Sequence, residues 1–204
     1  MYLPPHFTEA DPAEADRLID AFPLACLVAQ TPGGLAANHL PLLRDGAGMI
    51  GHVARAGGLH QMLPDGAEVL AVFRGEDSYI SPNWYPSKAE THRAVPTWNY
   101  QVVHIAARIR WDDSPKFKRR AVGLLTRRME GTEGWRMADA PADYMEAMLA
   151  AIVGFELTIT RVIAKTKTNQ NRSDADFLSV QARMAAQGKP ALAARMARMG
   201  RGGS

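Results

Sequence analysis

"LACLVAQTPGGLAANHLPLLRDGAGMIGHVA", residues 24–54, contains three short β-like runs separated by two turn signals. The runs cover residues 24–30, 35–43 and 49–54, and the turns are "TPGG" and "RDGAG". Glycine-containing turns of this length join antiparallel strands, whereas parallel strands need a crossover of about a dozen or more residues. The stretch therefore predicts antiparallel hairpins rather than βαβ units.

The rest of the chain extends this pattern. Further strands are expected at residues 67–75, 98–111 and 153–165, and the middle one alternates between an apolar face and a face carrying His104, Arg108 and Arg110. Helices are expected at residues 9–22, 57–63, 140–152 and 174–187 and from Pro115 onward. This order predicts a mainly β, α+β protein, in which a small antiparallel barrel has helices packed at its ends and edges.

Two of the expected helices carry start signals. Asp11 can cap the first helix, with Pro12 at the first helical position and Glu14 completing a capping box. Asp113 or Ser114 can cap the helix that begins at Pro115.

Length and composition favour one main domain. The chain has 204 residues, of which 47% are apolar, and we find no internal repeat and no convincing boundary before about residue 173. We therefore expect a domain over residues 1–173 and a basic helical extension over residues 174–204. The last residues, "MARMGRGGS", carry no pattern that could bury them and are expected to be disordered.

Charge is unevenly distributed. The formal net charge is +3, but residues 161–204 hold nine Lys or Arg against Asp174 and Asp176, which gives +7 there and −4 elsewhere. A basic tail is a candidate for contact with polyanions such as DNA, although a solvated helix with a frayed end explains it about as well. The tail has no recognisable recognition helix.

Several functional classes find no support. No apolar run reaches membrane-spanning length, and the start of the chain has no signal peptide, so a soluble cytoplasmic protein without membrane contact is expected. Cys26 is the only cysteine and cannot form an internal disulfide. His39, His52 and His60 lie on separate segments, so no metal site is expected.

The stretch "YISPNWYPSKAETHRAVPTWNY", residues 79–100, is unusual. It holds two of the four tryptophans and three of the five tyrosines, interleaved with Pro82, Pro86 and Pro96. The prolines argue against a strand and the aromatic residues argue against a disordered linker. We expect an ordered loop with a packing or binding role.

Polar residues also interrupt otherwise apolar runs, and together they offer cations, hydroxyls and amides. They are Asn38, His39, His52, Arg55, Ser81, Lys88, Thr97, Asn99, Lys165, Lys167, Gln170, Asn171 and Arg172. This inventory suits a ligand with a phosphate and a planar heteroaromatic ring. Taken singly, each residue has a simpler reading: His39 or His52 as a core histidine, Trp98 as core filling, and the cations as surface.

A set of motifs favours the ligand-binding interpretation of these residues over the structural one. In chain order, "YLPPHF", "ANHLPLL", "GHVARA", "YISPNWYPSK", "VPTWNY", "DAPADYMEAMLAAIVGFE" and "KTKTNQNR" resemble the PaiB-type family of FMN-binding negative transcriptional regulators. The resemblance covers residues 2 to about 185 and implies an antiparallel split β-barrel of the FMN-binding type. It also implies a homodimer with flavin sites at the subunit interface and an aromatic loop that builds the flavin pocket or the dimer wall beside it.

The resemblance also implies a set of flavin-binding residues. Arg55 and Lys88 would hold the phosphate of FMN, and residues 97–100 would lie near its ribityl chain or ring. Late-chain residues would close the site, from the same or the other subunit. The full set is His52, Arg55, Ser81, Ser87, Lys88, Thr97, Trp98, Asn99, Tyr100, Lys167, Gln170 and Asn171.

Three functions follow from this reading. The first is a negative transcriptional regulator that senses FMN or its redox state, with DNA contact implied by the family resemblance alone. The second is an FMN-dependent oxidoreductase acting on a small molecule, for which no catalytic residue is assigned. The third, less favoured, is a haem-binding split barrel with a histidine ligand.

Overall fold

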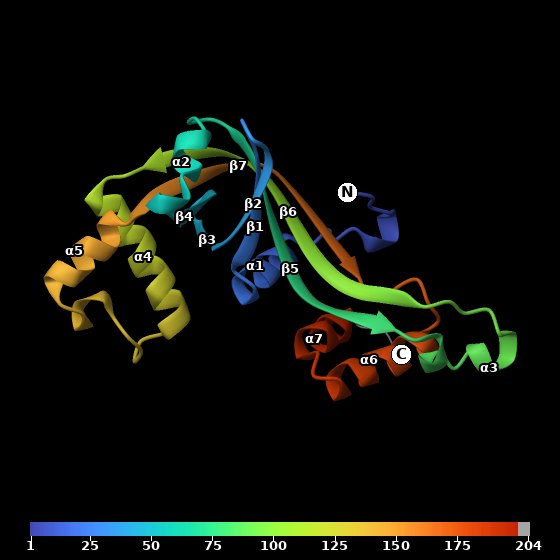
Figure 1. Ribbon diagram of the computed structural model, residues 1–204. Coiled ribbons are helices and arrows are strands. Elements are labelled where there is room, and N and C mark those ends of the chain that lie inside the picture. Colours follow the sequence, from blue (N-terminus) through green and yellow to red (C-terminus); the bar gives the residue numbers. More distant parts are fainter. Residues whose placement is uncertain (200–204) are drawn as a thin grey trace. The chain divides into compact units, whose positions relative to one another are not determined.

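Seven strands form a single sheet in the computed structural model, which describes residues 1–199 (Figure 1). The strand order is β2-β1-β5-β6-β7-β4-β3. The strands are β1 Leu24–Thr31, β2 Gly34–Pro41, β3 Leu43–Asp45, β4 Gly48–Ala54, β5 Glu68–Ile80, β6 Thr97–Asp112 and β7 Ile152–Lys167.

Helices flank this sheet. The longer ones are α1 Pro12–Ala21, α4 Pro115–Glu130, α5 Ala142–Ala150, α6 Asp174–Ala186 and α7 Pro190–Arg198. Short turns of helix occur at η1 Pro5–Phe7, η2 Arg55–Gly57, α2 Leu59–Met62, η3 Pro82–Trp84, α3 Lys88–Thr91 and η4 Met137–Asp139. Within residues 1–199, no helix is long and apolar enough to cross a membrane.

The chain divides into two compact units that are interleaved along the sequence. The first contains Met1–Ala21, Arg74–Val103 and the chain from Ile163 onward, and the second contains Phe22–Phe73 and His104–Val162. Strands β5, β6 and β7 each contribute one part to each unit.

The second unit holds the barrel. β1 pairs antiparallel with β2 from Leu24 opposite Pro41 to Thr31 opposite Gly34, as the turn "TPGG" predicts, and β4 pairs antiparallel with β7. The hydrogen-bonded order ends at β2 and β3, yet residues of β2 lie beside β4. The sheet is thus curled without a continuous ladder, and the predicted antiparallel split barrel is confirmed.

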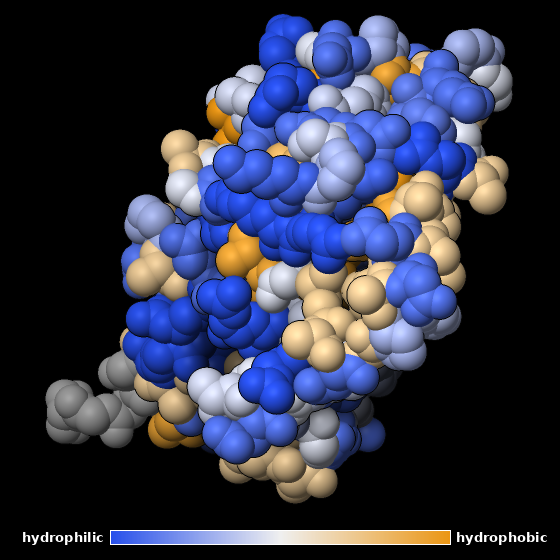
Figure 2. Space-filling view, turned by 90° about the vertical axis from the view of Figure 1, so that its left-hand side faces the viewer, coloured by the Kyte–Doolittle hydropathy of each residue, from blue (hydrophilic) through white to orange (hydrophobic). Residues whose placement is uncertain are grey.

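Burial alternates along the barrel strands. Ala25 and Leu27 of β1, Phe73 of β5, and Ile105 and Ile109 of β6 are fully buried, as period-two patterning requires. Helix α4 covers Ile50 through Phe117 and Ala121. Its N-cap is Ser114, whose hydroxyl accepts a hydrogen bond from the Phe117 N–H at 3.3 Å. The surface on the side where α4 and α5 lie in Figure 1 is mainly hydrophilic (Figure 2).

The first unit has its own apolar core. Helices α6 and α7 bury side chains against the end of β5 and the loop after it, in a cluster of Ile80, Tyr85, Phe177, Val180, Met184, Leu192 and Met196. Helix α7 covers the run "PALAARMAR", whose pattern is helical, and only its residues 196–198 fall within the stretch expected to be disordered. The expected disorder at residues 200–204 lies outside the described chain.

Two local expectations need correction. The capping box on α1 is only half formed: Asp11 accepts from the Ala13 N–H at 2.9 Å, but Glu14 is buried and binds arginines instead of the Asp11 N–H. The stretch at residues 79–100 is not one loop. It contains the end of β5, two helical turns and the start of β6: Pro82 begins the first turn, Pro86 lies between the two turns and Pro96 directly precedes β6.

Candidate functional site

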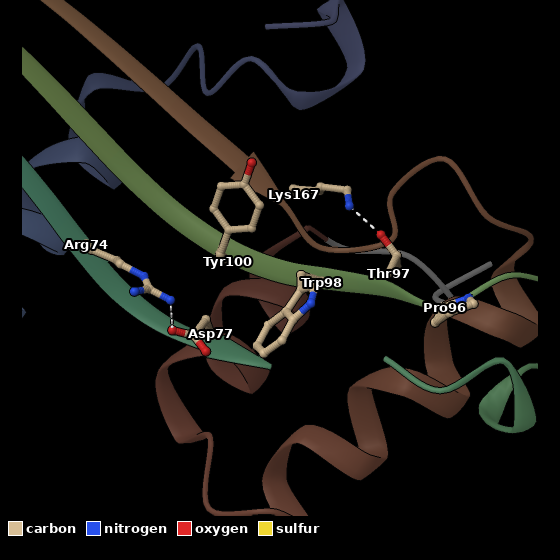
Figure 3. A pocket seen from close by; sticks show the side chains of 7 residues that line it. All are labelled: Arg74, Asp77, Pro96, Thr97, Trp98, Tyr100 and Lys167. Atoms are coloured by element: carbon tan, nitrogen blue, oxygen red, sulfur yellow. Dashed lines mark hydrogen bonds and ion pairs between the residues drawn. The ribbon is translucent and has the colours of Figure 1, made fainter. Parts of the chain in front are cut away.

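A surface cavity of about 610 Å³ lies in the first unit, where β6 begins and where β5 and β7 approach their last residues (Figure 3). Its lining is Arg74 and Asp77 of β5, Pro96, Thr97, Trp98 and Tyr100 at the start of β6, and Lys167 at the end of β7. Four of the twelve predicted flavin-binding residues are therefore brought together: Thr97, Trp98, Tyr100 and Lys167.

Two ammonium groups dominate the charge of this region. Lys167 donates a hydrogen bond to the Thr97 hydroxyl across the cavity (Figure 3). Lys165 is 8% exposed, donates to the backbone carbonyl of Tyr2 at 3.0 Å, and lies 5.4 Å from the Tyr100 ring centroid. Among residues 1–199, no carboxylate lies within ion-pair distance of Lys165 or Lys167.

The environment of Lys167 disfavours its charge. Burial is the largest cause that lowers the pKa of Lys167 below 10.5, and the neighbouring charges of Lys165 and Arg172 lower it further, against an opposing effect of Tyr100. A bound anion would compensate both ammonium groups. The lysines thus give this end of β7 the electrostatics of an anion site.

An exposed aromatic pair borders the cavity. The Trp98 side chain is 51% exposed and meets Tyr79, which is 47% exposed, in a T-shaped arrangement with ring centroids 6.0 Å apart. In the view of Figure 3, the indole lies between the Arg74–Asp77 pair and the Lys167–Thr97 pair. A large aromatic face open to solvent is suited to stacking against a planar ring.

Asn99 points to the other side of β6 from Trp98 and Tyr100. It is completely buried, and neither its amide oxygen nor its amide nitrogen has a hydrogen-bond partner within the described chain. An unpaired buried amide costs free energy, so it requires a partner such as an ordered water. Asn99 is not among the residues that line the cavity.

The other predicted residues of the first unit make local contacts. Ser87 donates to Asp176 of α6 through its hydroxyl at 2.7 Å, and Ser81 accepts from the Asn83 N–H at 3.2 Å. Lys88 donates to the Asn83 side chain. Gln170 folds back on its own turn, where it accepts from the Thr168 N–H at 2.7 Å, and Asn171 is exposed.

His52 and Arg55 belong to the second unit, and Arg55 is engaged there. Its guanidinium donates to the backbone carbonyls of Ala150 and Ile152 at 2.9 and 3.1 Å and to Asp113 at 2.5 Å. The hydrogen bond from Arg55 is the largest cause that lowers the pKa of Asp113. Burial lowers the pKa of His52. Within its unit, Arg55 therefore ties the end of β4 to the start of β7.

Comparison with known families identifies the chain. The family described as "Putative FMN-binding domain" matches residues 1–161. This protein belongs to that FMN-binding family. The match includes Thr97, Trp98 and Tyr100 and ends before Lys165 and Lys167, so the two lysines lie outside the part of the chain that the family match covers.

Individual relatives agree with this assignment. The chain is 26% identical over 185 residues to the protein "Protease synthase and sporulation protein PAI 2" of Bacillus subtilis, covering 88% of this chain and 87% of the relative. In fold it resembles the FAD and heme binding protein of Mycobacterium smegmatis, with a TM-score of 0.63, 18% identity and coverage of 84% and 79%. It also resembles the flavocytochrome Anf3 of Azotobacter vinelandii, with a TM-score of 0.61, 18% identity and coverage of 79% and 70%.

Sequence reasoning missed Arg74 and Asp77. They lie near the end of β5, which extends to Ile80 rather than stopping at residue 75, and they form an ion pair with each other. The sequence offered little signal for them, because the polar run "RGED" interrupts the period-two pattern of β5, which resumes only at Ser78–Ile80. Within residues 1–199, no three histidine, cysteine or acidic side chains are grouped so as to hold a metal ion.

Proposed function

We propose that the protein binds FMN in the cavity at the ends of β5, β6 and β7. One observation carries this proposal: the Lys167 ammonium, which has no carboxylate partner in the described chain, lines the same cavity as the exposed Trp98, and Lys165, also without such a partner, lies over the Tyr100 ring. An anion and a planar ring are the two parts of FMN that such groups recognise. The family match supports the same cofactor.

The residues present fit this cofactor. Lys167, with Thr97 beside it, would bind the phosphate, and Lys165 adds positive charge behind it. Trp98 and Tyr100 would contact the ring. The proposal moves the phosphate away from Arg55, whose guanidinium is already bound to Asp113 and two carbonyls.

FMN, when bound, supplies hydride or electron transfer. The chain's own residues would bind and orient it, with Lys167 kept charged by the phosphate despite its burial. The cavity is open to solvent beside Trp98, which leaves room for a second molecule to approach.

Two functions are open to a flavin-binding protein of this kind, an oxidoreductase and a DNA-binding regulator. We favour FMN-dependent redox chemistry over direct DNA binding. The tail was expected to provide cations for DNA, but Arg195 is buried and bound to Glu9 at 2.6 Å, and Arg198 is bound to Glu14. These two charges are therefore compensated within the chain. A negative regulatory role would then act through the redox state of the flavin or through a protein partner.

We also propose that a second copy of the chain covers the outward face of the barrel sheet. This face exposes Leu24 and Leu35, the latter 79% exposed, and a cavity of about 520 Å³ lies over it, lined by Val28, Leu35, Leu70 and Ala106 together with the polar Gln30, Glu68, Thr160 and Arg161. Exposed apolar side chains rimmed by polar ones mark association sites. The occupant is a second copy because the resemblance to split barrels implies a homodimer.

Fluorescence titration of apo-protein with FMN and with riboflavin tests the cofactor site. FMN should bind more tightly, and Lys167→Met should weaken FMN about tenfold to a hundredfold, since hydrogen bonds to charged groups contribute about 1.5–3 kcal/mol. Riboflavin should be unaffected by this change, because it lacks the phosphate. Lys116→Met, an exposed lysine on α4, is the matched control.

Trp98→Ala should weaken both flavins, since it removes a ring contact that they share. Equal affinities of the parent for FMN and riboflavin, together with unchanged FMN binding by Lys167→Met, would exclude the phosphate assignment.

Anaerobic addition of NAD(P)H to the FMN-loaded protein tests redox function: bleaching of the flavin absorbance supports it. Absence of bleaching, combined with DNA binding at moderate salt, would favour the regulator.

A further inference from the structure

A second cavity, of about 430 Å³, lies in the other unit between the C-terminal half of α4 and the loop that follows it. Its lining is Gly123, Thr126 and Arg127 of α4 and Gly131, Thr132, Trp135, Arg136 and Met137 of the loop. The flavin proposal uses none of these residues. The volume is within the range of small-molecule sites.

The cavity combines an aromatic wall with positive charge. Trp135 is 44% exposed, and the Met137 thioether lies on the same lining. The Arg127 side chain has no hydrogen-bond or ion-pair partner within residues 1–199. The Arg136 guanidinium has one long contact in the described chain, with Asp139 at 3.4 Å, and both arginines are exposed.

Local hydrogen bonds constrain the loop that presents Trp135. The backbone N–H of Trp135 donates to the Glu130 carboxylate at 3.3 Å, and the backbone N–H of Arg136 donates to the Asp139 carboxylate at 2.9 Å. Gly134 packs so closely on Glu130 that a β-carbon would collide with it. A site built on a fixed loop loses less conformational entropy when it binds a ligand.

Gly123 is the most informative lining residue. It lies in the interior of a 16-residue helix, where glycine is less favourable than alanine. Packing does not require it, because a β-carbon there would lie 3.8 Å from the Met137 sulfur, an ordinary contact distance. The absence of a side chain instead keeps the helix wall of the cavity open.

We propose that this cavity is a second ligand site, for a small aromatic carboxylate. The ring would lie against Trp135 and Met137, and the carboxylate would bind Arg127 and Arg136, whose planar guanidinium groups match a carboxylate. An inorganic anion would leave the indole unused, and a neutral aromatic compound would leave both arginines unused.

The test uses benzoate as the probe and the Trp135 indole N–H resonance of the full chain as the reporter, assigned with Trp135→Phe. Benzoate should shift this resonance saturably, and benzyl alcohol, its neutral counterpart, should bind at least about tenfold more weakly. Arg127→Met and Arg136→Met should each weaken benzoate about tenfold or more. Lys116→Met, on the same helix but outside the cavity, should leave it unchanged.

Two substitutions at Gly123 distinguish a loss of benzoate binding from a loss of folding. Gly123→Ala should raise the midpoint of thermal unfolding by about 2–4 °C, because it removes the helix penalty of glycine. Gly123→Leu should leave the protein folded and abolish the benzoate shift, since the side chain fills the cavity. Equal binding of benzoate and benzyl alcohol, unaltered affinity in both arginine variants, or a shift that survives in Gly123→Leu would each overturn the proposal.

Discussion

Arg198 on the last helix forms a bidentate pair with Glu14 on the first, with its Nε and Nη2 atoms 2.7 and 2.9 Å from the two carboxylate oxygens. Glu14 is buried and also receives Arg17 at 2.6 Å. This pair joins segments 184 residues apart and fixes α7 against α1 within one compact unit.

Arg198→Met should lower the free energy of unfolding by about 1–3 kcal/mol, because it removes two charge-assisted hydrogen bonds from a buried carboxylate. The lower part of this range is expected, since Arg198 is partly exposed and Arg17 still binds Glu14. Urea denaturation followed by circular dichroism measures the change. Arg93→Met, at an exposed position, should cost almost nothing, and equal losses in the two variants would contradict the account.

The same pair should make stability depend on pH. The hydrogen bond from Arg198 is the largest cause that lowers the pKa of Glu14 below 4.5 in the folded state. The contribution of the Glu14–Arg198 pair to stability is therefore complete above pH 4.5, and it is lost as the pH falls through the folded-state pKa of Glu14. The stability gap between the parent and Arg198→Met should narrow in acid, and a gap that stays constant as the solution is acidified far below pH 4.5 would refute this.

Lys167 should behave in the opposite sense. Because burial lowers its pKa in the folded protein, the charged form is disfavoured on folding at neutral pH, and the penalty disappears as pH rises through the folded pKa toward 10.5. Lys167→Met should thus raise the free energy of unfolding of the apo-protein at pH 7, with a difference that shrinks toward pH 10.5. Thermal unfolding at several pH values measures it. A destabilised variant at pH 7 would show that the Lys167–Thr97 hydrogen bond outweighs the cost of burial.

The C-terminal helices should be needed for folding of their unit. Phe177 is fully buried in the cluster formed by α6, α7 and Ile80, so Phe177→Ala should cost about 3–5 kcal/mol. Leu178→Ala, at an exposed neighbouring position, should cost less than about 1 kcal/mol. Chemical denaturation compares the two. A mild effect at Phe177 would indicate that α6 and α7 are dispensable, in which case deleting residues 174–204 would be a valid test of nucleic-acid binding.

Leu35→Glu should convert the proposed dimer into a monomer, because it places a charge on the outward face of the barrel sheet, where the second copy is proposed to pack. Sedimentation velocity at micromolar concentration measures the mass of parent and variant. Val95→Glu is a control that changes another strongly exposed apolar residue, 67% exposed, outside the barrel unit. A parent that sediments as a monomer would dispose of the dimer proposal without affecting the cavity proposed for FMN.

Short-range patterns determined most of the secondary structure. The two turns at residues 31–34 and 44–48 predicted antiparallel pairing, and the structure has it in register. Of the two cap candidates, Asp113 and Ser114, it is Ser114 that caps α4. These features depend on hydrogen bonds and apolar periodicity within about ten residues, and such interactions can be read directly from the sequence.

The partners of charged side chains that lie far apart in the sequence could not be predicted from local patterns. Glu14 has the spacing of a capping box, yet its carboxylate binds Arg198, because α7 folds back onto α1 and offers a stronger, charged donor. Arg55 was expected to bind a phosphate, yet it binds Asp113 and two carbonyls that only the fold brings near it.

The cavity proposed for FMN shows the same division. The sequence by itself determined which residue types could bind a phosphate and a ring, and it singled out Thr97, Trp98, Tyr100 and Lys167. Only the tertiary structure decided that these four meet at the ends of neighbouring strands together with Arg74 and Asp77, while Ser87 is used to hold α6. The physical reason is that a site depends on which strands become neighbours, and strand pairing is decided by burial over the whole sheet rather than by any local motif.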